Sequence, residues 1–135
     1  MEAQAAFEYM VIVGLVLAFL LPIWAYIASL QQQTSTQLSI SYAKNAADII
    51  ADTADLVFSQ GAPAKVEVRI YIPKNVENVS IINNTIDFKI LIDSTLSDIS
   101  ATSSAKLNGT IPTREGTYTF SIEAKDGFVQ ITEVV

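Results

Sequence analysis

The sequence predicts an α+β fold. We expect one long N-terminal helix, followed by a small antiparallel β-sheet or sandwich domain packed on the second half of that helix. Residues 4–30 are almost entirely apolar, and Glu8 is their only charged residue. After Pro63 the apolar residues stop recurring every three or four positions and begin to alternate, which is the period of a strand. Gly61 and Pro63 form a strong helix stop at this change.

Composition limits the classes of function. The chain has 135 residues, enough for one domain and an accessory element. It has no Cys and no His, which removes disulfides, thiolate sites and the commonest general base and metal ligand. The formal net charge of -6 argues against a nucleic-acid partner. No nucleophile or phosphate-loop motif is present, so we expect neither enzyme activity nor a cofactor.

Residues 9–30 predict the first half of the helix. At ~1.5 Å per residue these residues span about 33 Å, close to the thickness of a bilayer's hydrocarbon core. Apolar residues lie on every side of such a helix, so lipid or protein must cover it all round. Trp24 and Tyr26 lie near the far end, where an aromatic belt would fall. The run is too long for a cleaved secretory signal, and no basic region precedes it.

Residues 38–56 predict the second, amphipathic half. Apolar or small residues recur there at spacings of three and four: Leu38, Tyr42, Ala46, Ile49, Thr53 and Leu56. We expect this stripe to lie across the β-sheet. Asp48, Asp52 and Asp55 form an acidic stripe that we interpret as a solvated face, although in a filament it could instead meet Lys or Arg of a neighbour. Lys44 can pair with Asp48 at a contribution of ~0.3 kcal/mol.

The remaining residues predict five or six short strands. Residues 65–72 alternate clearly, and Asn83-Asn84 indicates a tight turn between residues 79–82 and 85–92. The clearest hairpin joins residues 117–124 and 128–134 through Lys125-Asp126-Gly127. Residues 93–104 are rich in Ser, Thr and Asp and predict a loop, and Asn108-Gly109 is a further turn signal.

These elements predict three regions. A helical region covers residues 4–61, of which residues 4–30 form the transmembrane or filament-core part. A β-rich exposed domain covers residues 62–135, and residues 1–3 are a possible leader.

The start of the apolar run carries a motif. Residues 4–9 read QAAFEY: Gln, two small residues, a bulky apolar residue, Glu and an aromatic residue. With the apolar helix that follows, this resembles the class III signal region of archaeal type IV pilins. The resemblance implies that a membrane peptidase cuts between Ala3 and Gln4 and leaves the apolar helix on the mature protein. The leader differs from the family, because it has only three residues, Ala3 stands where Gly is usual, and Glu2 is acidic rather than basic.

The resemblance also implies a function. Such a subunit is first held in the membrane by its apolar helix. It then self-assembles into a helical homopolymer, an extracellular filament for adhesion or surface attachment. A class III signal peptidase, a platform protein and an assembly ATPase are the implied partners. The residues implied in assembly are Gln4, Phe7, Glu8, Tyr9, Gly14 and Pro22.

Glu8 has two interpretations. A carboxylate in an apolar environment costs several kcal/mol unless it is paired. The resemblance implies that Glu8 meets the terminal amine of Gln4 in a neighbouring subunit and fixes the register of the helices. Alternatively, Glu8 lies in the first helical turn near the lipid headgroups, where the helix dipole contributes ~0.3–1 kcal/mol.

Three further features have open interpretations. Pro22 deletes the hydrogen bond to the Ala18 carbonyl and should kink the helix, although membrane helices often carry Gly and Pro. Asp93 and Asp98 could bind Ca²⁺, but solvated carboxylates explain them as well. Three Asn-x-Ser/Thr sequons predict surface glycosylation with at least one site unoccupied, and their asparagines are Asn78, Asn83 and Asn108.

Other functions remain as alternatives. The first is a minor pilin or an anchoring subunit of the archaeal motility filament, which is a membrane-anchored β domain that does not polymerise in bulk. A motility-filament subunit proper fits less well, because its mature start is usually Gly-rich. An enzyme ranks last.

Overall fold

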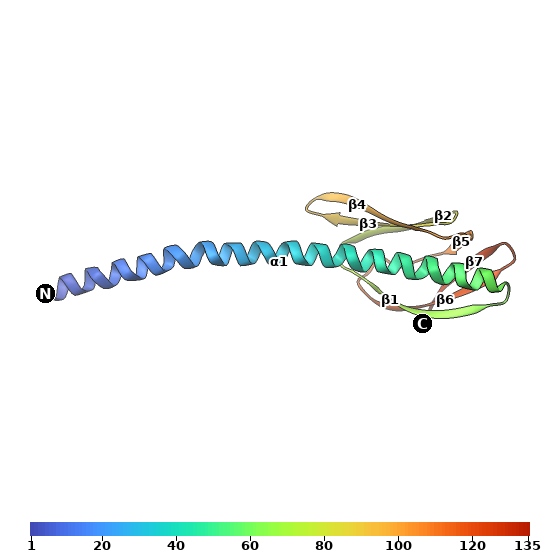
Figure 1. Ribbon diagram of the computed structural model, residues 1–135, viewed down its shortest axis with the longest axis horizontal. Coiled ribbons are helices and arrows are strands. Elements are labelled where there is room, and N and C mark those ends of the chain that lie inside the picture. The colour runs from blue at the N-terminus through green and yellow to red at the C-terminus, as the bar shows by residue number, and fades with distance from the viewer. The chain divides into compact units, whose positions relative to one another are not determined.

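The computed structural model describes residues 1–135 and confirms the α+β fold. Helix α1 (Glu2–Gln60) continues through Pro22. The chain divides into two units, Met1–Thr36 and Gln37–Val135. Seven strands follow the helix (Figure 1): β1 (Lys65–Ile72), β2 (Val76–Ile82), β3 (Thr85–Ile92), β4 (Thr95–Thr102), β5 (Leu107–Gly109), β6 (Gly116–Lys125) and β7 (Phe128–Val134).

The strands form two sheets. One has the order β1-β6-β7-β5, and the other is the meander β2-β3-β4. All pairings are antiparallel except that of β5 with β7. In the second unit, Gln37–Val135, the two sheets lie on either side of the helix. Their strands run along the helix (Figure 1).

The helix contributes an alanine-rich face to the core. We call this the alanine face, and its residues are Ala43, Ala46, Ala47, Ile50, Ala51, Ala54 and Val57, none more than 3 % exposed. Their spacing of three and four follows the helical period. They pack in one cluster with apolar residues of both sheets, including Phe88 and Phe120. Small side chains let both sheets approach the helix closely.

Only part of the stripe predicted to lie across the sheet does so, since Ala46 is in the core and Ile49 packs against it. Leu38, Tyr42 and Leu56 are 48 %, 45 % and 50 % exposed, Ile49 is half-buried, and only Ala46 of that set is fully buried. The prediction weighted large apolar side chains. The structure instead buries the small ones, because two sheets must fit around one helix.

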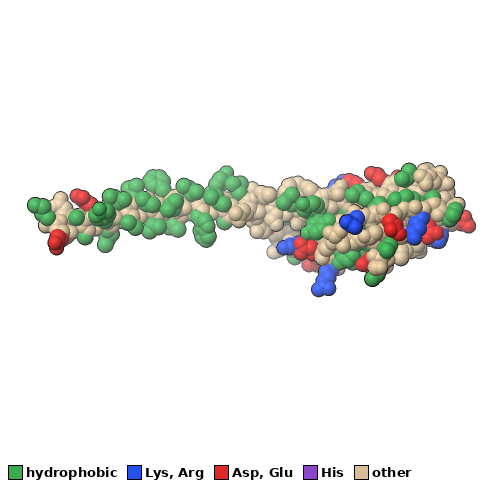
Figure 2. Space-filling model, turned by 90° about the horizontal axis from the view of Figure 1, so that it is seen from below, with side chains coloured by type: hydrophobic (Ala, Val, Ile, Leu, Met, Phe, Trp, Pro, Cys, Tyr) green, Lys and Arg blue, Asp and Glu red, His purple; other side chains and the backbone are tan.

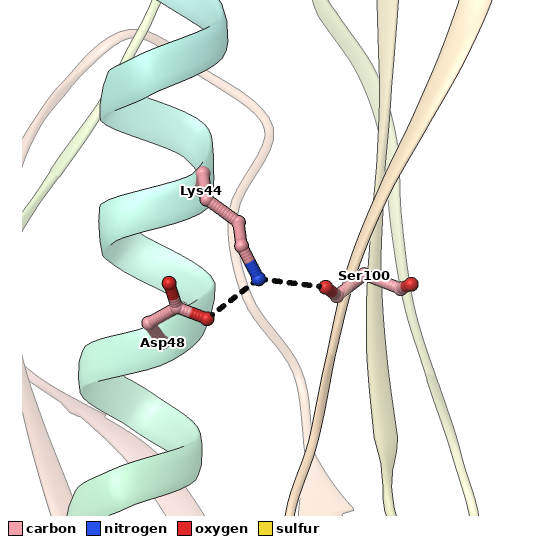
Figure 3. Close-up of polar contacts among 3 residues, drawn as sticks. All are labelled: Lys44, Asp48 and Ser100. Atoms are coloured by element: carbon pink, nitrogen blue, oxygen red, sulfur yellow. Dashed lines mark hydrogen bonds and ion pairs between the residues drawn. The ribbon is translucent and has the colours of Figure 1, made fainter.

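Polar contacts join the helix to the meander sheet. The Lys44 ammonium lies 2.8 Å from Asp48, as predicted, and also donates to the Ser100 carbonyl of β4 at 3.3 Å (Figure 3). Asp55 is not the solvated carboxylate that was predicted, because it accepts hydrogen bonds from Ser103 and the backbone N–H of Ser104. Ser103 and Ser104 are therefore tied to the helix.

Turn chemistry sets the hairpins. The predicted turns at Asn83-Asn84 and Asp126-Gly127 are present, with Asn83 at φ 56° and Gly127 at φ 84°. The predicted loop over residues 93–104 is wrong, since Asp93 and Ser94 (φ 45° and 68°) make a two-residue turn that leads into β4. Positive φ at both positions is the pattern of a type I′ turn.

The turn predicted at Asn108-Gly109 is also wrong. Both residues belong to β5, which pairs in parallel with β7. A Cβ at Gly109 would clash with the Ile131 carbonyl oxygen, so glycine is required by the close approach of β7. The glycine is explained by strand packing rather than by a reversal of the chain.

Candidate assembly surface

The apolar segment, residues 4–30, is uncovered in the single chain. Every large apolar side chain from Phe7 to Leu30 is at least 42 % exposed, and Trp24 reaches 73 %. Figure 2 shows hydrophobic side chains along this part of the chain. Nearly all charged side chains lie instead on the second unit, Gln37–Val135, which we call the β-rich unit. By length and composition α1 could cross a membrane. The N-terminal apolar helix is therefore suited to membrane insertion or secretion.

Exposure does not favour one side of this segment. Consecutive residues from Met10 to Val13 are all exposed, so no face is withdrawn from the solvent. A folded soluble monomer rarely exposes a continuous apolar surface of this size, and such surfaces mark contacts with lipid or protein. A partner that covers only one side would leave the rest exposed.

Glu8 lies within this surface. It lines a shallow hollow with Phe7, Val11 and Ile12, and none of the three ion pairs of the chain includes it. Glu8 lies in the second turn of α1, which begins at Glu2. Its carboxylate makes no ion pair within its own chain.

The other predicted assembly and processing residues lie on the same helix. Ala3 and Gln4 occupy its first turn and are exposed, as are Phe7 and Tyr9. A Cβ added at Gly14 would meet no atom within 4 Å, so the single chain gives no packing reason for glycine there. A close approach by another helix would supply one.

The three sequon asparagines are all exposed and lie in different settings. Asn78 is on β2, Asn83 is in the turn between β2 and β3, and Asn108 is on β5. The Asn108 side-chain amide donates to Gln130 at 3.2 Å. The three asparagines are accessible, and the Asn83 carbonyl accepts a hydrogen bond from the backbone N–H of Leu107 at 2.7 Å.

The carboxylates considered for Ca²⁺ lie apart in the topology. Asp93 is in the β3–β4 turn, and Asp98 is on β4 opposite Lys89. No group of three His, Cys, Asp or Glu side chains is placed to hold a metal ion.

Sequence reasoning missed that three residues of the predicted stripe, Leu38, Tyr42 and Leu56, are exposed. No local signal separates these three from Ile49, which has the same spacing and packs against the core.

Comparison with protein-family models, with characterised proteins and with solved structures gives no match to this chain. The architecture itself is pilin-like: a long N-terminal apolar helix is followed by β-sheets that pack on its later residues.

Proposed function

We propose that the protein is the structural subunit of an extracellular type IV-like pilus, which polymerises through its N-terminal helix for adhesion or surface attachment. The observation that carries the proposal is the apolar segment, which is exposed on every side and contains one carboxylate. Lipid can cover such a helix before assembly, and neighbouring copies can cover it afterwards. The β-rich unit would then form the outer surface.

The proposal gives Glu8 a role that its single-chain surroundings leave open. Moving an apolar helix from lipid to a protein core exchanges one apolar environment for another, so hydrophobic burial supplies little specificity. A buried carboxylate must be paired, because an isolated one costs several kcal/mol. If the chain is cut before Gln4, the new amine of a neighbouring copy can neutralise Glu8. That pair would fix the axial position of each subunit.

The other parts of the proposal follow from the resemblance. A class III signal peptidase, a platform protein and an assembly ATPase would act on the subunit, which would have no catalytic role of its own. The exposed sequon asparagines suit a domain that faces the cell exterior. We propose no cofactor and no nucleic-acid partner.

Glu8→Ala and Glu8→Gln test the proposal when the full chain is produced in cells with a type IV assembly system. Glu133→Gln is the matched control, because Glu133 is exposed on β7 and makes no ion pair. We expect the Glu8 variants to reduce sheared filaments by tenfold or more, since each ~1.4 kcal/mol of lost pairing is a factor of ten. The control should assemble normally, and all variants should keep the folded β-rich unit.

Negative-stain microscopy and cell fractionation give the readout. Filaments that contain the chain would support the proposal. A wild-type chain that stays in the membrane fraction would instead favour the membrane-anchored module. Normal filament yield from both Glu8 variants would exclude the register role of Glu8.

A further inference from the structure

Each of the two sheets ends in two edge strands, and three of these edges carry features that limit pairing with another strand. β5 is only three residues long. The register of β2 shifts between Val76 and Asn78. β1 carries alternating charges, with Lys65 3.9 Å from Glu67. Short strands, bulges and charged side chains all protect sheet edges. The remaining edge strand, β4, is eight residues long and regular.

The turn between β3 and β4 determines which backbone groups of β4 face the open edge. A two-residue turn makes its flanking residues, Ile92 and Thr95, a hydrogen-bonded pair. Successive residues of a strand point their N–H and C=O groups to opposite sides, so every second residue after Thr95 also bonds to β3. The residues between them face the open edge, and all of these edge-facing residues are exposed: Leu96, Asp98, Ser100 and Thr102.

A side chain of the helix occupies one of these edge groups. The Lys44 ammonium donates to the Ser100 carbonyl at 3.3 Å (Figure 3), which agrees with the assignment of that carbonyl to the open edge. Asp48, one helical turn later, holds the same ammonium at 2.8 Å. The cover on β4 is therefore supplied by another element rather than by the strand itself.

We propose that Lys44 keeps the open edge of β4 from pairing with β4 of a second copy of this chain. One antiparallel register pairs all the edge-facing residues. In it Leu96 lies opposite Thr102 of the other copy. Asp98 lies opposite Ser100, and the Ser100 carbonyl would accept from the Asp98 N–H of the other copy. Lys44 already bonds to that carbonyl and places an ammonium where the second strand would lie. Because the pair is two-fold symmetric, both copies meet the same obstacle.

The charge on β4 itself does not close this edge. Asp98 is the only charged residue of the strand, and like charges directly opposite each other destabilise a strand pair. In the register described above, however, Asp98 faces Ser100 and not its own copy. Leu96 is 54 % exposed, and its cross-strand partner Leu91 is exposed as well. A long edge strand that also exposes apolar side chains is an aggregation site unless something covers it.

The ion pair of Lys44 with Asp48 is better explained by orientation than by helix stability. Both side chains are about half exposed, and surface ion pairs of this kind contribute little to stability. Lys44 also precedes Asp48, which is the less favourable order of charges along a helix. What the pair does is restrict a flexible side chain, so that its ammonium stays beside the Ser100 carbonyl.

Lys44→Met and Lys44→Ala in the full chain, purified in detergent, test the proposal. Lys106→Met is the matched control, because Lys106 is exposed and makes no ion pair. Sedimentation equilibrium measures the monomer–dimer constant. We expect both Lys44 variants to shift it toward the dimer by about tenfold, equivalent to ~1.4 kcal/mol, and the control to leave it unchanged. Association through the apolar segment is common to all variants, so the comparison removes it.

Amide hydrogen exchange locates the contact. In dimers of Lys44→Ala the amides of the edge-facing residues should exchange more slowly than in the wild-type chain. Adding Ser100→Lys returns a lysine to the same edge and should restore the monomer. Slower exchange in other strands alone would overturn the proposal, and so would a monomer–dimer constant that neither Lys44 variant changes. No filament is needed for these measurements, so their outcome is independent of the proposed function.

Discussion

Ser103 donates a hydrogen bond from Oγ to the Asp55 carboxylate over 2.6 Å, and this contact joins the helix to the chain that leaves β4. The Ser103 side chain is only 2 % exposed. The same carboxylate oxygen accepts from the backbone N–H of Ser104 at 2.7 Å. A residue read as solvated in the sequence is therefore a structural clamp.

Removing this clamp should destabilise the second unit. We expect Asp55→Ala to lower the free energy of unfolding by about 2–3 kcal/mol, because hydrogen bonds to a charged group contribute roughly 1.5–3 kcal/mol and the buried Ser103 hydroxyl loses its acceptor. Denaturant unfolding of the full chain in detergent, followed by circular dichroism, measures the change. Asp52→Ala is the control and should change stability little. Equal effects at the two positions would contradict the assignment.

The burial pattern on the helix predicts an unusual order of substitution costs. Ile50→Ala should cost about 2–5 kcal/mol, because it opens a cavity in a fully buried site. Leu56→Ala should cost far less, since half of that side chain is already exposed. The same unfolding measurement compares them. A larger loss at Leu56 than at Ile50 would mean that the helix buries its other face.

Tyr71 predicts a pH effect in the alkaline range. The hydrogen bond to Glu115, with smaller contributions from burial and from the charge of that carboxylate, raises the pKa of Tyr71 above 10.0. A raised pKa in the folded state means that this contribution to stability is fully present below the unfolded pKa and is lost as pH rises through the folded pKa.

Absorbance titration of tyrosinate tests this effect. Subtracting the titration of Tyr71→Phe from that of the wild type should isolate a tyrosine that ionises above its usual range. Glu115→Ala should bring the pKa of Tyr71 back toward 10.0, because it removes both the hydrogen bond to Glu115 and the charge of that carboxylate. Tyr118→Phe is a suitable control, since the Tyr118 hydroxyl donates only to the Arg114 carbonyl. An unchanged Tyr71 titration in Glu115→Ala would contradict the assigned cause.

The sequons differ in their surroundings, and occupancy should follow. We expect Asn83, in an exposed turn, to be glycosylated more fully than Asn108, whose amide is bonded to Gln130 within a paired strand. Peptide mass spectrometry of native material measures occupancy at each site. Asn83→Gln should remove the larger share of glycan mass. Full occupancy at Asn108 with none at Asn83 would show that local strand pairing does not limit access.

The sequence predicted the elements whose signals are local. An uncharged apolar run, the Gly61 and Pro63 stop, the alternation over residues 65–72 and the Asp126-Gly127 turn each depend on near neighbours, and the structure has all of them. The exposure of Glu8 and the apolar segment could likewise be anticipated, because a small β domain cannot cover a helix that is apolar on every side.

The errors came from tertiary context. Alanine is weakly hydrophobic, so a pattern-based prediction passed over the alanine face in favour of Leu38 and Leu56. Only the presence of a sheet on each side of the helix makes small residues the better core. The strand β4 was predicted as a loop because of its Ser, Thr and Asp content. That content suits the edge strand of a sheet, which faces solvent. The three-residue strand β5 exists only because β7 lies beside it.

The alanine face also bears on how the second unit would respond to tension. Its buried side chains are spread over four turns of the helix, and the strands run along the same direction (Figure 1). A pull along the helix axis would have to slide many interlocked side chains at once rather than open the sheets one contact at a time. The close packing of these small side chains between the two sheets would therefore make the domain resist shear.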